Sequence, residues 1–547
     1  MPIVAKFRLF HYDSAIMSGV PTPRLLQLSA WLLLWAASVA MAAAPYLEKQ
    51  GTAMRLMVKG QPMLVLAGEL GNSSASSAAY MAPHWARLKA MHLNTVLAPV
   101  SWELIEPREG EFDWSSVDGL ITAARANDLK LVVLWFGAWK NSMSTYAPAW
   151  VKRDQARFPR AQLPSGQSLD ILSALVPATL EADAHAFAAL LGHLKQTDGD
   201  RNTVLMIQVE NEVGMLPIAR EYGSEAERLF HAAVPDELVQ KLGKKPGDWE
   251  TVFGGGDAAA EAFSAWNYAR YVDSVAKAGK AVYPLPMYVN AALNHSGKAP
   301  GEYPSGGPVP HLLDIWKAGA PTLGLLAPDI YFPNFVDLAG AFKRADNPLF
   351  IPEANNADRE EVPANAFYAF AQLDAIGFGP FAIESIDTRQ ANPLAQAYDV
   401  LGQLSPAILQ AQGLGKMAGF RPRILEDGTL IEAPRSETIG GYRFTVSFID
   451  PWTPKGDQKI ANHGGLIVQV GPEDYLLAGQ GMVVTFGAVG EGPPNAGIDN
   501  VREGSFDSRG SWIPGRLLNG DQTHQGRHLR LEPGRFQIQR VRLYRYR

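Results

Sequence analysis

The feature that most constrains the fold of this chain is an alternation of short apolar runs with helix-like stretches, between about residues 60 and 400. The stretches between the runs repeat their apolar residues at helical spacing, as in Val117–Asn127 and Ala258–Ala281. Continuous apolar strands separated by helices are typical of a parallel sheet that is covered on both faces. The eight runs are Met63–Leu66, Thr95–Pro99, Leu129–Trp135, Thr203–Val209, Leu285–Val289, Gly324–Asp329, Pro348–Pro352 and Pro380–Ile383.

These strand–helix units predict a (β/α)8 barrel over residues 43–410. A doubly wound open sheet is the alternative arrangement of the same units. No glycine-rich phosphate-binding fingerprint follows any early run, which weakens that alternative. In a barrel of this kind the active site lies at the carboxyl ends of the strands, so polar residues that directly follow an apolar run are the candidates for chemistry.

The pattern of predicted secondary structure changes after Gln412. Short strand-like segments replace the helix-like stretches, with turn residues such as Asp427-Gly428 and Pro533-Gly534 between them. This pattern predicts an all-β, sandwich-like domain over residues 411–547. A structural role, with the domain docked on the barrel, is the simpler interpretation, and sugar binding is the other. The segments are Arg443–Ile449, Gly465–Val470, Met482–Phe486, His528–Leu531 and Phe536–Tyr546.

The N-terminal segment has the pattern of a secretory signal peptide. Arg24 precedes an apolar stretch that carries no charge before Glu48, and Ala40-Met41-Ala42 matches a small-residue cleavage site. A membrane anchor is the alternative, but the stretch is short for one and ends in alanines. We therefore expect residues 1–42 to be removed, and the mature chain to be periplasmic or secreted without membrane contact.

The composition excludes several classes of partner and cofactor. The chain has no cysteine, so it has no disulfide, no thiolate metal site and no lipid anchor of the kind that needs a cysteine at the cleavage point. Its formal net charge is −6 and no basic stripe is present, which argues against nucleic-acid binding. No ligand cluster points to a metal, and we expect no cofactor. Nothing in the sequence indicates an oligomeric state.

Carboxylates gather at the ends of the apolar runs, where the active site of a barrel lies. The fourth run ends in Glu210-Asn211-Glu212 and the seventh in Glu353. Cleavage of a glycosidic bond needs two such groups: one protonates the leaving oxygen, and the other attacks the anomeric carbon or activates water. We therefore expect a carbohydrate substrate. The other carboxylates that follow runs include Glu69, Glu103 and Glu384.

Three stretches of the sequence resemble glycoside hydrolase family 35, the β-galactosidases of a clan with (β/α)8 barrels. They are IQVENEVG at Ile207–Gly214, NTVLAPVSWELIEPREGEFDW at Asn94–Trp114 and PAWVK at Pro148–Lys152. The first is similar to the acid/base motif of that family. The resemblance covers about residues 50 to 400. It extends to a bacterial branch with a C-terminal β domain of formerly unknown function, in which some enzymes remove galactose from xyloglucan.

The resemblance implies roles for individual residues. Glu212 corresponds to the general acid/base, Asn211 to the partner of the sugar's 2-hydroxyl group, and Glu353 to the nucleophile. Glu210 is then a neighbour, for which we expect a structural role. The alternative is that the charge of Glu210 raises the pKa of Glu212.

The sequence departs from the family's pattern after the third run. Typical members carry a Cys-Ala-Glu-Trp motif there, whose glutamate helps to hold galactose, whereas this chain has LWFGAWKNSMS at Leu134–Ser144. The departure puts a strict preference for galactose in question but leaves the reaction class unchanged. Tyr331 is a candidate to hydrogen-bond the nucleophile, and core packing is the alternative for the tryptophans. The candidate sugar contacts beside Asn211 are Trp102, Trp135, Trp139, Lys140, Asn141, Asn290, Tyr331 and Glu384.

These observations predict a retaining, exo-acting β-galactosidase that works by double displacement on oligo- or polysaccharides. Another glycosidase of the same clan, such as a β-glucosidase, would share the fold and the carboxylates. A galactosidase of family 42 is a further alternative, although those enzymes often carry a cysteine zinc cluster. An alternative from another class is a non-catalytic carbohydrate-binding protein with a barrel scaffold.

Overall fold

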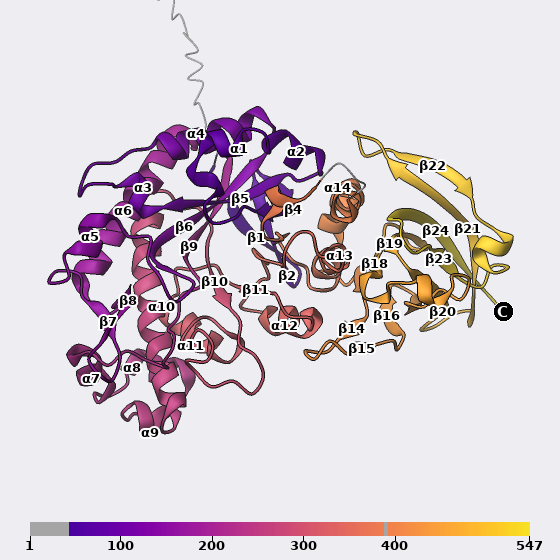
Figure 1. Ribbon diagram of the computed structural model, residues 1–547. Helices are drawn as coiled ribbons and strands as arrows, with labels where there is room; N and C mark the ends of the chain where they lie inside the picture. Colours follow the sequence, from indigo (N-terminus) through magenta and orange to yellow (C-terminus); the bar gives the residue numbers. More distant parts are fainter. Residues whose placement is uncertain (1–42, 388–391) are drawn as a thin grey trace, which may run out of the picture. The chain divides into compact units, whose positions relative to one another are not determined.

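The computed structural model describes residues 43–387 and 392–547 (Figure 1). The segment predicted to be a signal peptide, residues 1–42, lies outside the described residues. Within the described ranges, no helix combines the length and the hydropathy that crossing a bilayer requires. The described residues belong to one compact unit.

The barrel is built on one parallel sheet with the strand order β11-β10-β9-β6-β5-β4-β12. Isolated parallel bridges join Asp329 to Glu353 and Ile351 to Phe378, so that residues 351–353 connect the two edge strands. The sheet thus closes into the predicted eight-membered barrel, whose seventh member consists of these bridges. The strands are β4 (Val65–Glu69), β5 (Thr95–Ser101), β6 (Lys130–Lys140), β9 (Val204–Asn211), β10 (Met287–Ala292), β11 (Leu325–Asp329) and β12 (Gly377–Phe378). An antiparallel sheet of β1 (Tyr46–Gln50), β2 (Ala53–Val58) and β3 (Gln61–Met63) precedes them.

Two of the predicted strands lie elsewhere than the sequence indicated. The first run divides, because Gln61–Met63 pairs antiparallel with β2 and the barrel strand begins only at Val65. The eighth barrel strand, β12, ends before the predicted Pro380–Ile383. Pro380 has no N–H group to donate to a strand ladder, and Ala382 adopts a left-handed conformation with φ of 54° that leads into the 3-10 turn Ile383–Ser385.

Helices lie outside the barrel strands, as Figure 1 shows for α4, α6 and α10. Successive side chains of β6 point alternately into two different hydrophobic cores. Val132, Leu134 and Phe136 belong to a compact cluster inside the barrel, whereas Val133 and Trp135 belong to the larger core shared with the helices. The longer helices are α4 (Ser115–Ala126), α6 (Pro177–Asp198), α10 (Asp257–Val282), α12 (Phe335–Phe342), α13 (Val362–Gln372) and α14 (Pro393–Ala411). The shorter ones are α1 (Ala78–Met81), α2 (Trp85–Ala90), α3 (Trp102–Ile105), α5 (Ala149–Arg153), α7 (Ser224–Phe230), α8 (Asp236–Leu242), α9 (Trp249–Phe253) and α11 (Leu313–Gly319).

After α14 the chain forms an all-β domain, as the sequence predicted. One antiparallel sheet has the order β13-β18-β19-β24-β21-β22, and a second has β16-β17-β20-β23. Buried side chains of both sheets, among them Phe444 and Tyr475, form a core of their own. The strands are β13 (Met417–Phe420), β16 (Arg435–Ile439), β17 (Tyr442–Ser447), β18 (Gly464–Gln469), β19 (Asp474–Gln480), β20 (Met482–Ala488), β21 (Asn495–Phe506), β22 (Trp512–Leu517), β23 (Leu529–Leu531) and β24 (Gln537–Tyr546).

A small hairpin of β14 (Arg423–Ile424) and β15 (Leu430–Ile431) contacts loops of the barrel. Arg423 donates to both carboxylate oxygens of Asp337 on α12. At the turn of the hairpin, the carboxylate of Glu426 accepts hydrogen bonds from the backbone N–H of Ser296 at 2.9 Å and from its hydroxyl at 2.5 Å. The hairpin therefore holds a loop that follows β10, at the carboxyl end of the barrel strands.

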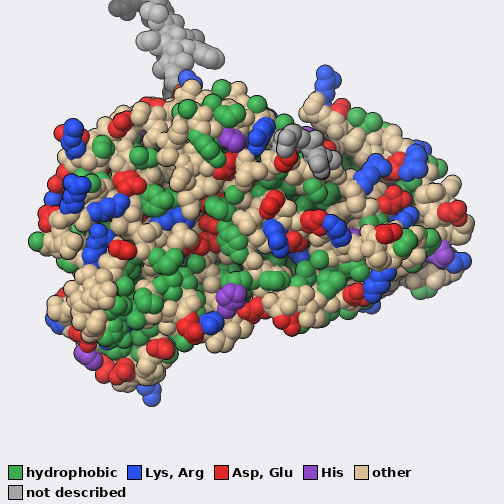
Figure 2. Space-filling view, in the orientation of Figure 1, with side chains coloured by type: hydrophobic (Ala, Val, Ile, Leu, Met, Phe, Trp, Pro, Cys, Tyr) green, Lys and Arg blue, Asp and Glu red, His purple; other side chains and the backbone are tan. Residues whose placement is uncertain are grey.

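Acidic and basic side chains are interspersed on the face of the molecule drawn in Figure 2. This mixture agrees with the modest formal net charge of −6.

Tyr398 on α14 contacts β4 and β12, the pair of strands at which the end of the barrel sheet meets its beginning. Its buried hydroxyl lies 2.7 Å from the carbonyl oxygen of Ala67 on β4 and 3.0 Å from that of Phe378 on β12. We predict that Tyr398→Phe lowers the free energy of unfolding by about 1–3 kcal/mol, because it leaves buried carbonyl groups without a donor. Urea unfolding followed by tryptophan fluorescence measures the change, and Tyr544→Phe on the exposed surface is the control. Equal midpoints for Tyr398→Phe and wild type would contradict the prediction.

Candidate active site

The end of β9 departs from regular strand geometry at both of its glutamates. Glu210 and Glu212 have φ of 61° and 46°, in the left-handed region that non-glycine residues rarely occupy. Neighbouring residues of a strand normally point to opposite faces, and this bend allows Asn211 and Glu212 to reach the same end of the barrel. The backbone of Glu212 is held on both sides: its N–H donates to Asn290 Oδ1 at 2.9 Å, and its carbonyl oxygen accepts from the Ser142 hydroxyl at 2.6 Å.

Three buried carboxyl groups converge at this end of the barrel. One carboxylate oxygen from each of Glu212, Asp329 and Glu353 lies within 4.8 Å of the corresponding oxygens of the other two. Tyr331, which follows β11, donates its hydroxyl proton to Glu353 Oε2 at 2.6 Å. The structure therefore brings together Glu212, Glu353 and Tyr331, which the sequence placed after three different strands.

The surroundings of Glu212 favour its protonated form. Burial raises the pKa of the Glu212 carboxyl to about 7, and the charge of Glu353 acts in the same direction, because like charges disfavour ionisation. The ammonium of Lys140 and a hydrogen bond with Asp329 act in the opposite direction. A carboxyl group with a pKa near neutrality is suited to give and take a proton at neutral pH.

Two further carboxyl groups in the cluster are also shifted towards their protonated forms. Burial, followed by the charge of Glu353, raises the pKa of Glu69 well above its usual value. The same two causes raise the pKa of Asp329, which also accepts a hydrogen bond from Asn290 Nδ2 at 2.7 Å. Protonated carboxyl groups are hydrogen-bond donors. A protonated Glu69, which is hydrogen-bonded to Glu353, can therefore stabilise a negative charge on that residue. Asp329 is instead hydrogen-bonded to Glu212.

Lys140 fixes the orientation of the Asn211 amide. Its ammonium, at the end of β6, donates to Asn211 Oδ1 at 2.6 Å, and both side chains are buried. In the described part of the chain, Asn211 Nδ2, the side-chain amide of Gln208 and the hydroxyl of Tyr288 have no hydrogen-bond partner. Buried polar atoms without a partner are costly and uncommon. Their gathering inside the barrel indicates a site that takes up a polar ligand or water.

The three predicted tryptophans do not line this site. Trp102, Trp135 and Trp139 are fully buried in the core between the strands and the helices. Trp135 Nε1 donates to Asp183 on α6 at 2.9 Å, and the Trp139 ring packs edge-on against Tyr271 on α10, with ring centroids 4.4 Å apart. These indoles face the outer helices, so their expected contact with sugar is replaced by core packing.

Glu384, another predicted sugar contact, is hydrogen-bonded to the loop after β4. Its carboxylate accepts hydrogen bonds from the N–H of Gly71 at 3.0 Å and from the hydroxyl of Ser74, both in the loop after β4. The 3-10 turn that replaces the expected strand directs the side chain to this loop. Asn141 lies beyond Lys140 in the loop after β6, with φ of 55°, whereas Asn290 lies within the cluster and bonds both Glu212 and Asp329.

Sequence reasoning missed three side chains of the cluster: Asp329, Tyr288 and Gln208. Asp329 ends the sixth run in the same way that Glu69 ends the first, so the strand-end rule contained a signal for it. Tyr288 and Gln208 lie within apolar runs. Nothing in such a run separates a residue that faces a ligand from one that fills the core.

Glu210 forms a buried pair with Asp183 on the helix-facing side of β9. Its Oε2 accepts from the backbone N–H of Trp139 at 2.9 Å, while Oε1 has no donor facing it among the described residues. Burial, followed by the charge of Asp183, raises the pKa of Glu210 well above its usual value. A proton on Glu210 Oε1, donated to Asp183, satisfies both groups. Gly137 makes room for the pair, because a Cβ there would lie 2.5 Å from Glu210 Oε1.

Among the described residues, Glu212, Asp329 and Glu353 are also the group of carboxylates close enough to hold a metal ion. The ammonium of Lys140 already supplies a positive charge beside them and lowers the pKa of Glu212 and of Asp329. The site therefore has a built-in counter-charge, and its carboxyl groups are arranged for proton transfer.

Parts of the chain are similar to known proteins. Residues 77–260, which include Glu212, match the model of glycoside hydrolase family 42, described as beta-galactosidase. Residues 394–530 match a domain of unknown function, DUF5597. Membership of family 35, which the motifs indicated, stays a prediction. A beta-galactosidase of Xanthomonas manihotis is 28% identical over 224 residues, which are 39% of this chain and 34% of that protein.

Solved structures of beta-galactosidases also share similarity with the chain. The enzyme from Rahnella sp. R3 has a TM-score of 0.45 at 15% identity, over 66% of this chain and 57% of its own. The enzyme from Bacillus circulans sp. alkalophilus has a TM-score of 0.46 at 14% identity, over 63% of this chain and 57% of its own. The chain thus spans about a third of the curated relative and under two thirds of these structures.

The Glu210–Asp183 pair generates a test of protonation. Gln at position 210 keeps an N–H donor towards Asp183 and an acceptor for Trp139 at every pH, so we predict that Glu210→Gln folds and retains activity. Glu210→Ala leaves buried partners unsatisfied and should lose about 1–3 kcal/mol of unfolding free energy. Because the pKa of Glu210 is raised in the folded state, its proton stabilises the fold most below pH 4.5, and this stabilisation is lost as the pH rises.

Glu210→Gln should therefore gain stability relative to wild type between pH 5 and pH 8, measured by urea unfolding at both pH values. The surface variant Glu225→Gln controls for the change of net charge. A Glu210→Gln protein that weakens relative to wild type as the pH rises would show that Glu210 is ionised in the fold.

Proposed function

We propose that the chain is a retaining β-galactosidase that removes terminal β-D-galactosyl residues from oligo- or polysaccharides. The observation that carries the proposal is the pairing of two buried glutamates. The pKa of Glu212 is about 7, and one of its carboxylate oxygens lies within 4.8 Å of one oxygen of Glu353. Retaining glycosidases hold the two carboxyl groups about 5–5.5 Å apart, whereas inverting ones hold them about 6.5–9.5 Å apart to leave room for water. The observed spacing supports retention.

In this mechanism Glu353 attacks the anomeric carbon, and Glu212 gives its proton to the glycosidic oxygen as the bond to the leaving group breaks. Tyr331, which donates to Glu353 Oε2, holds the attacking carboxylate in position. Glu212, now ionised, takes a proton from water, and the resulting hydroxide displaces Glu353 from the sugar. Two inversions at the anomeric carbon give net retention.

Asn211 is the side chain proposed to contact the bound sugar next to the reacting carbon. Its Nδ2 atom has no partner among the described residues, and Lys140 occupies its oxygen, so the amide is oriented to donate. A hydrogen bond to the sugar's 2-hydroxyl group strengthens in the transition state. Lys140 thus acts on catalysis through the orientation of Asn211.

Galactose as the sugar is proposed from the match of residues 77–260 and from the relatives that carry the same description. One panel of an aryl β-galactoside, an aryl β-glucoside and galactosylated xyloglucan oligosaccharides tests it. Faster hydrolysis of the glucoside would make the enzyme a β-glucosidase. Hydrolysis of no substrate would make the chain a carbohydrate-binding protein. From the predicted signal peptide we further propose that the enzyme acts outside the cytoplasm.

The roles of the two glutamates are separable with azide. Glu212→Ala should lower kcat by about 10²–10⁴-fold on substrates with poor leaving groups, and less on activated aryl galactosides. Added azide should then give a β-galactosyl azide, identified by NMR. Glu353→Ala should abolish turnover of both kinds of substrate. Glu103→Ala, a carboxylate that is bonded to Lys152, is the control and should stay near wild type. Substantial activity in Glu353→Ala would remove Glu353 from the mechanism.

The pH profile tests the electrostatic balance around the acid. Because the reaction needs protonated Glu212, kcat/KM should fall as the pH rises through about 7. Lys140 lowers the pKa of Glu212, so Lys140→Met should raise that pKa and move the basic limb to higher pH, with a reduced maximum. Lys152→Met, which removes a lysine outside the cluster, should leave the limb in place. A basic limb that stays in place or moves to lower pH in Lys140→Met would contradict this assignment.

A further inference from the structure

The β domain carries an exposed tryptophan on a rigid loop. Trp452 follows β17 in the segment FIDPWTP and keeps 47% of its surface exposed. Pro451 and Pro454 flank it, and each proline fixes its own φ angle. An isolated exposed aromatic residue is common, so the surroundings of this one decide whether it has a function.

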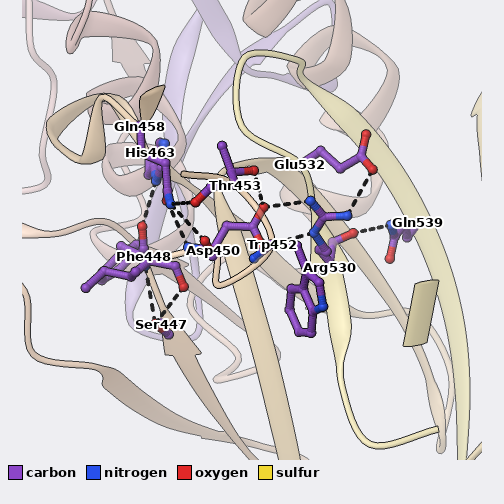
Figure 3. A network of polar contacts seen from close by, with 11 residues as sticks. Ser447, Phe448, Asp450, Trp452, Thr453, Gln458, His463, Arg530, Glu532 and Gln539 are labelled. Carbon is purple, nitrogen blue, oxygen red and sulfur yellow. Dashed lines mark hydrogen bonds and ion pairs between the residues drawn. The ribbon is translucent and has the colours of Figure 1, made fainter. Parts of the chain in front are cut away.

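A hydrogen-bonded network holds the loop in one conformation (Figure 3). The fully buried Asp450 carboxylate accepts from the N–H of Trp452, the hydroxyl of Thr453 and two nitrogens of Arg530, at 2.6–3.2 Å. Gln458 donates to the carbonyl oxygens of Asp450 and Thr453. In Figure 3 the indole points away from the Asp450 carboxylate. The network therefore orders the backbone while the ring remains outside it.

One arginine and two histidine side chains lie close to the exposed indole. The Arg530 guanidinium lies 5.5 Å from its centroid, and the His528 and His524 rings lie at 4.8 and 5.8 Å. His528 is 4% exposed, and its Nε2 has no hydrogen-bond partner among the described residues. Burial, together with the charges of His524 and Arg530, lowers its pKa, so the imidazole is neutral at pH 7. The neutral His528 ring therefore packs against both the indole and the exposed His524 ring.

The loop that carries the histidines has an unusual backbone. His524, Gln525 and Gly526 are three consecutive residues with positive φ, of 46°, 58° and 82°. Non-glycine residues in this region store strain, which accumulates at ligand sites. In this conformation the His524 ring lies nearly parallel to that of His528, with centroids 5.3 Å apart.

We propose that Trp452, His524, His528 and Arg530 form a carbohydrate-binding surface, separate from the catalytic residues, that holds a polysaccharide chain. A pyranose ring has an apolar C–H face and a rim of hydroxyl groups. The exposed indole stacks on the face, and the imidazole of the exposed His524 bonds a hydroxyl group. Because the loop is already ordered, binding costs little conformational entropy. The choice of carbohydrate rests on the proposed function, since the barrel of the same chain acts on glycosides.

Affinity electrophoresis of the full chain tests this surface. The native gels contain soluble galactosylated xyloglucan or β-1,4-galactan, and each protein also carries Glu353→Gln so that the polysaccharide is not hydrolysed. We expect Trp452→Leu to bind at least one of these polymers about tenfold more weakly than its parent, and Trp452→Phe to retain most of the affinity. Tyr546→Ala removes an aromatic residue of the same 47% exposure from the same domain and should bind as the parent does.

Three results would overturn the proposal: equal retardation of Trp452→Leu and its parent, an equal loss in Tyr546→Ala, or no retardation of the parent in either polymer. A change in the oligomeric state of Trp452→Leu, measured by light scattering, would assign the indole to contact between copies of the chain instead. Hydrolysis of a small aryl β-galactoside by Trp452→Leu with Glu353 intact should equal that of wild type. That assay tests the catalytic site alone, so failure of the binding surface and failure of the proposed function are distinguishable.

Discussion

Burial of carboxyl groups at the carboxyl ends of the barrel strands is the constraint on which the site depends. An ionised carboxylate is costly to remove from water, and several close together cannot all carry charge. Glu69, Glu212 and Asp329 respond with raised pKa values. The ammonium of Lys140 offsets part of the remaining charge. A proton donor beside a hydrogen-bonded carboxylate follows from this balance, because the acid and base roles of paired carboxyl groups are set by their surroundings.

The left-handed residues at the end of β9 determine which carboxyl group serves which purpose. Glu210 and Glu212 are two residues apart, and in a regular strand they would share a face. Their positive φ values break that alternation. Glu210 then lies against Asp183 on α6, while Glu212 lies beside Glu353. One acidic pair thus lies between strand and helix, and the other lies at the carboxyl end of the barrel.

The sequence contained the order of the barrel strands and the approach of Glu212 to Glu353, because strand ends of a parallel barrel meet at one edge. It did not contain the direction of the tryptophans. The run Leu129–Trp135 is buried on both faces, so no polar alternation marks which residues point inward. Asp183 lies on a helix, 27 residues before Glu210 in the printed numbering, and only the fold joins them. Glu384 was misplaced because the left-handed turn at Ala382 replaced the expected strand.

The β domain belongs to the site through the loops that it holds. Glu426 fixes Ser296 in the loop after β10, and the adjacent His295 ring packs 3.9 Å from that of Phe332. Phe332 directly follows Tyr331, the residue that donates to Glu353. Loosening the hairpin would therefore free the segment that carries the hydrogen-bond donor to Glu353, even though the hairpin contributes no side chain to the carboxyl cluster. The Trp452 loop is held by a different network around Asp450, so the domain can support the barrel and present a binding surface without one role constraining the other.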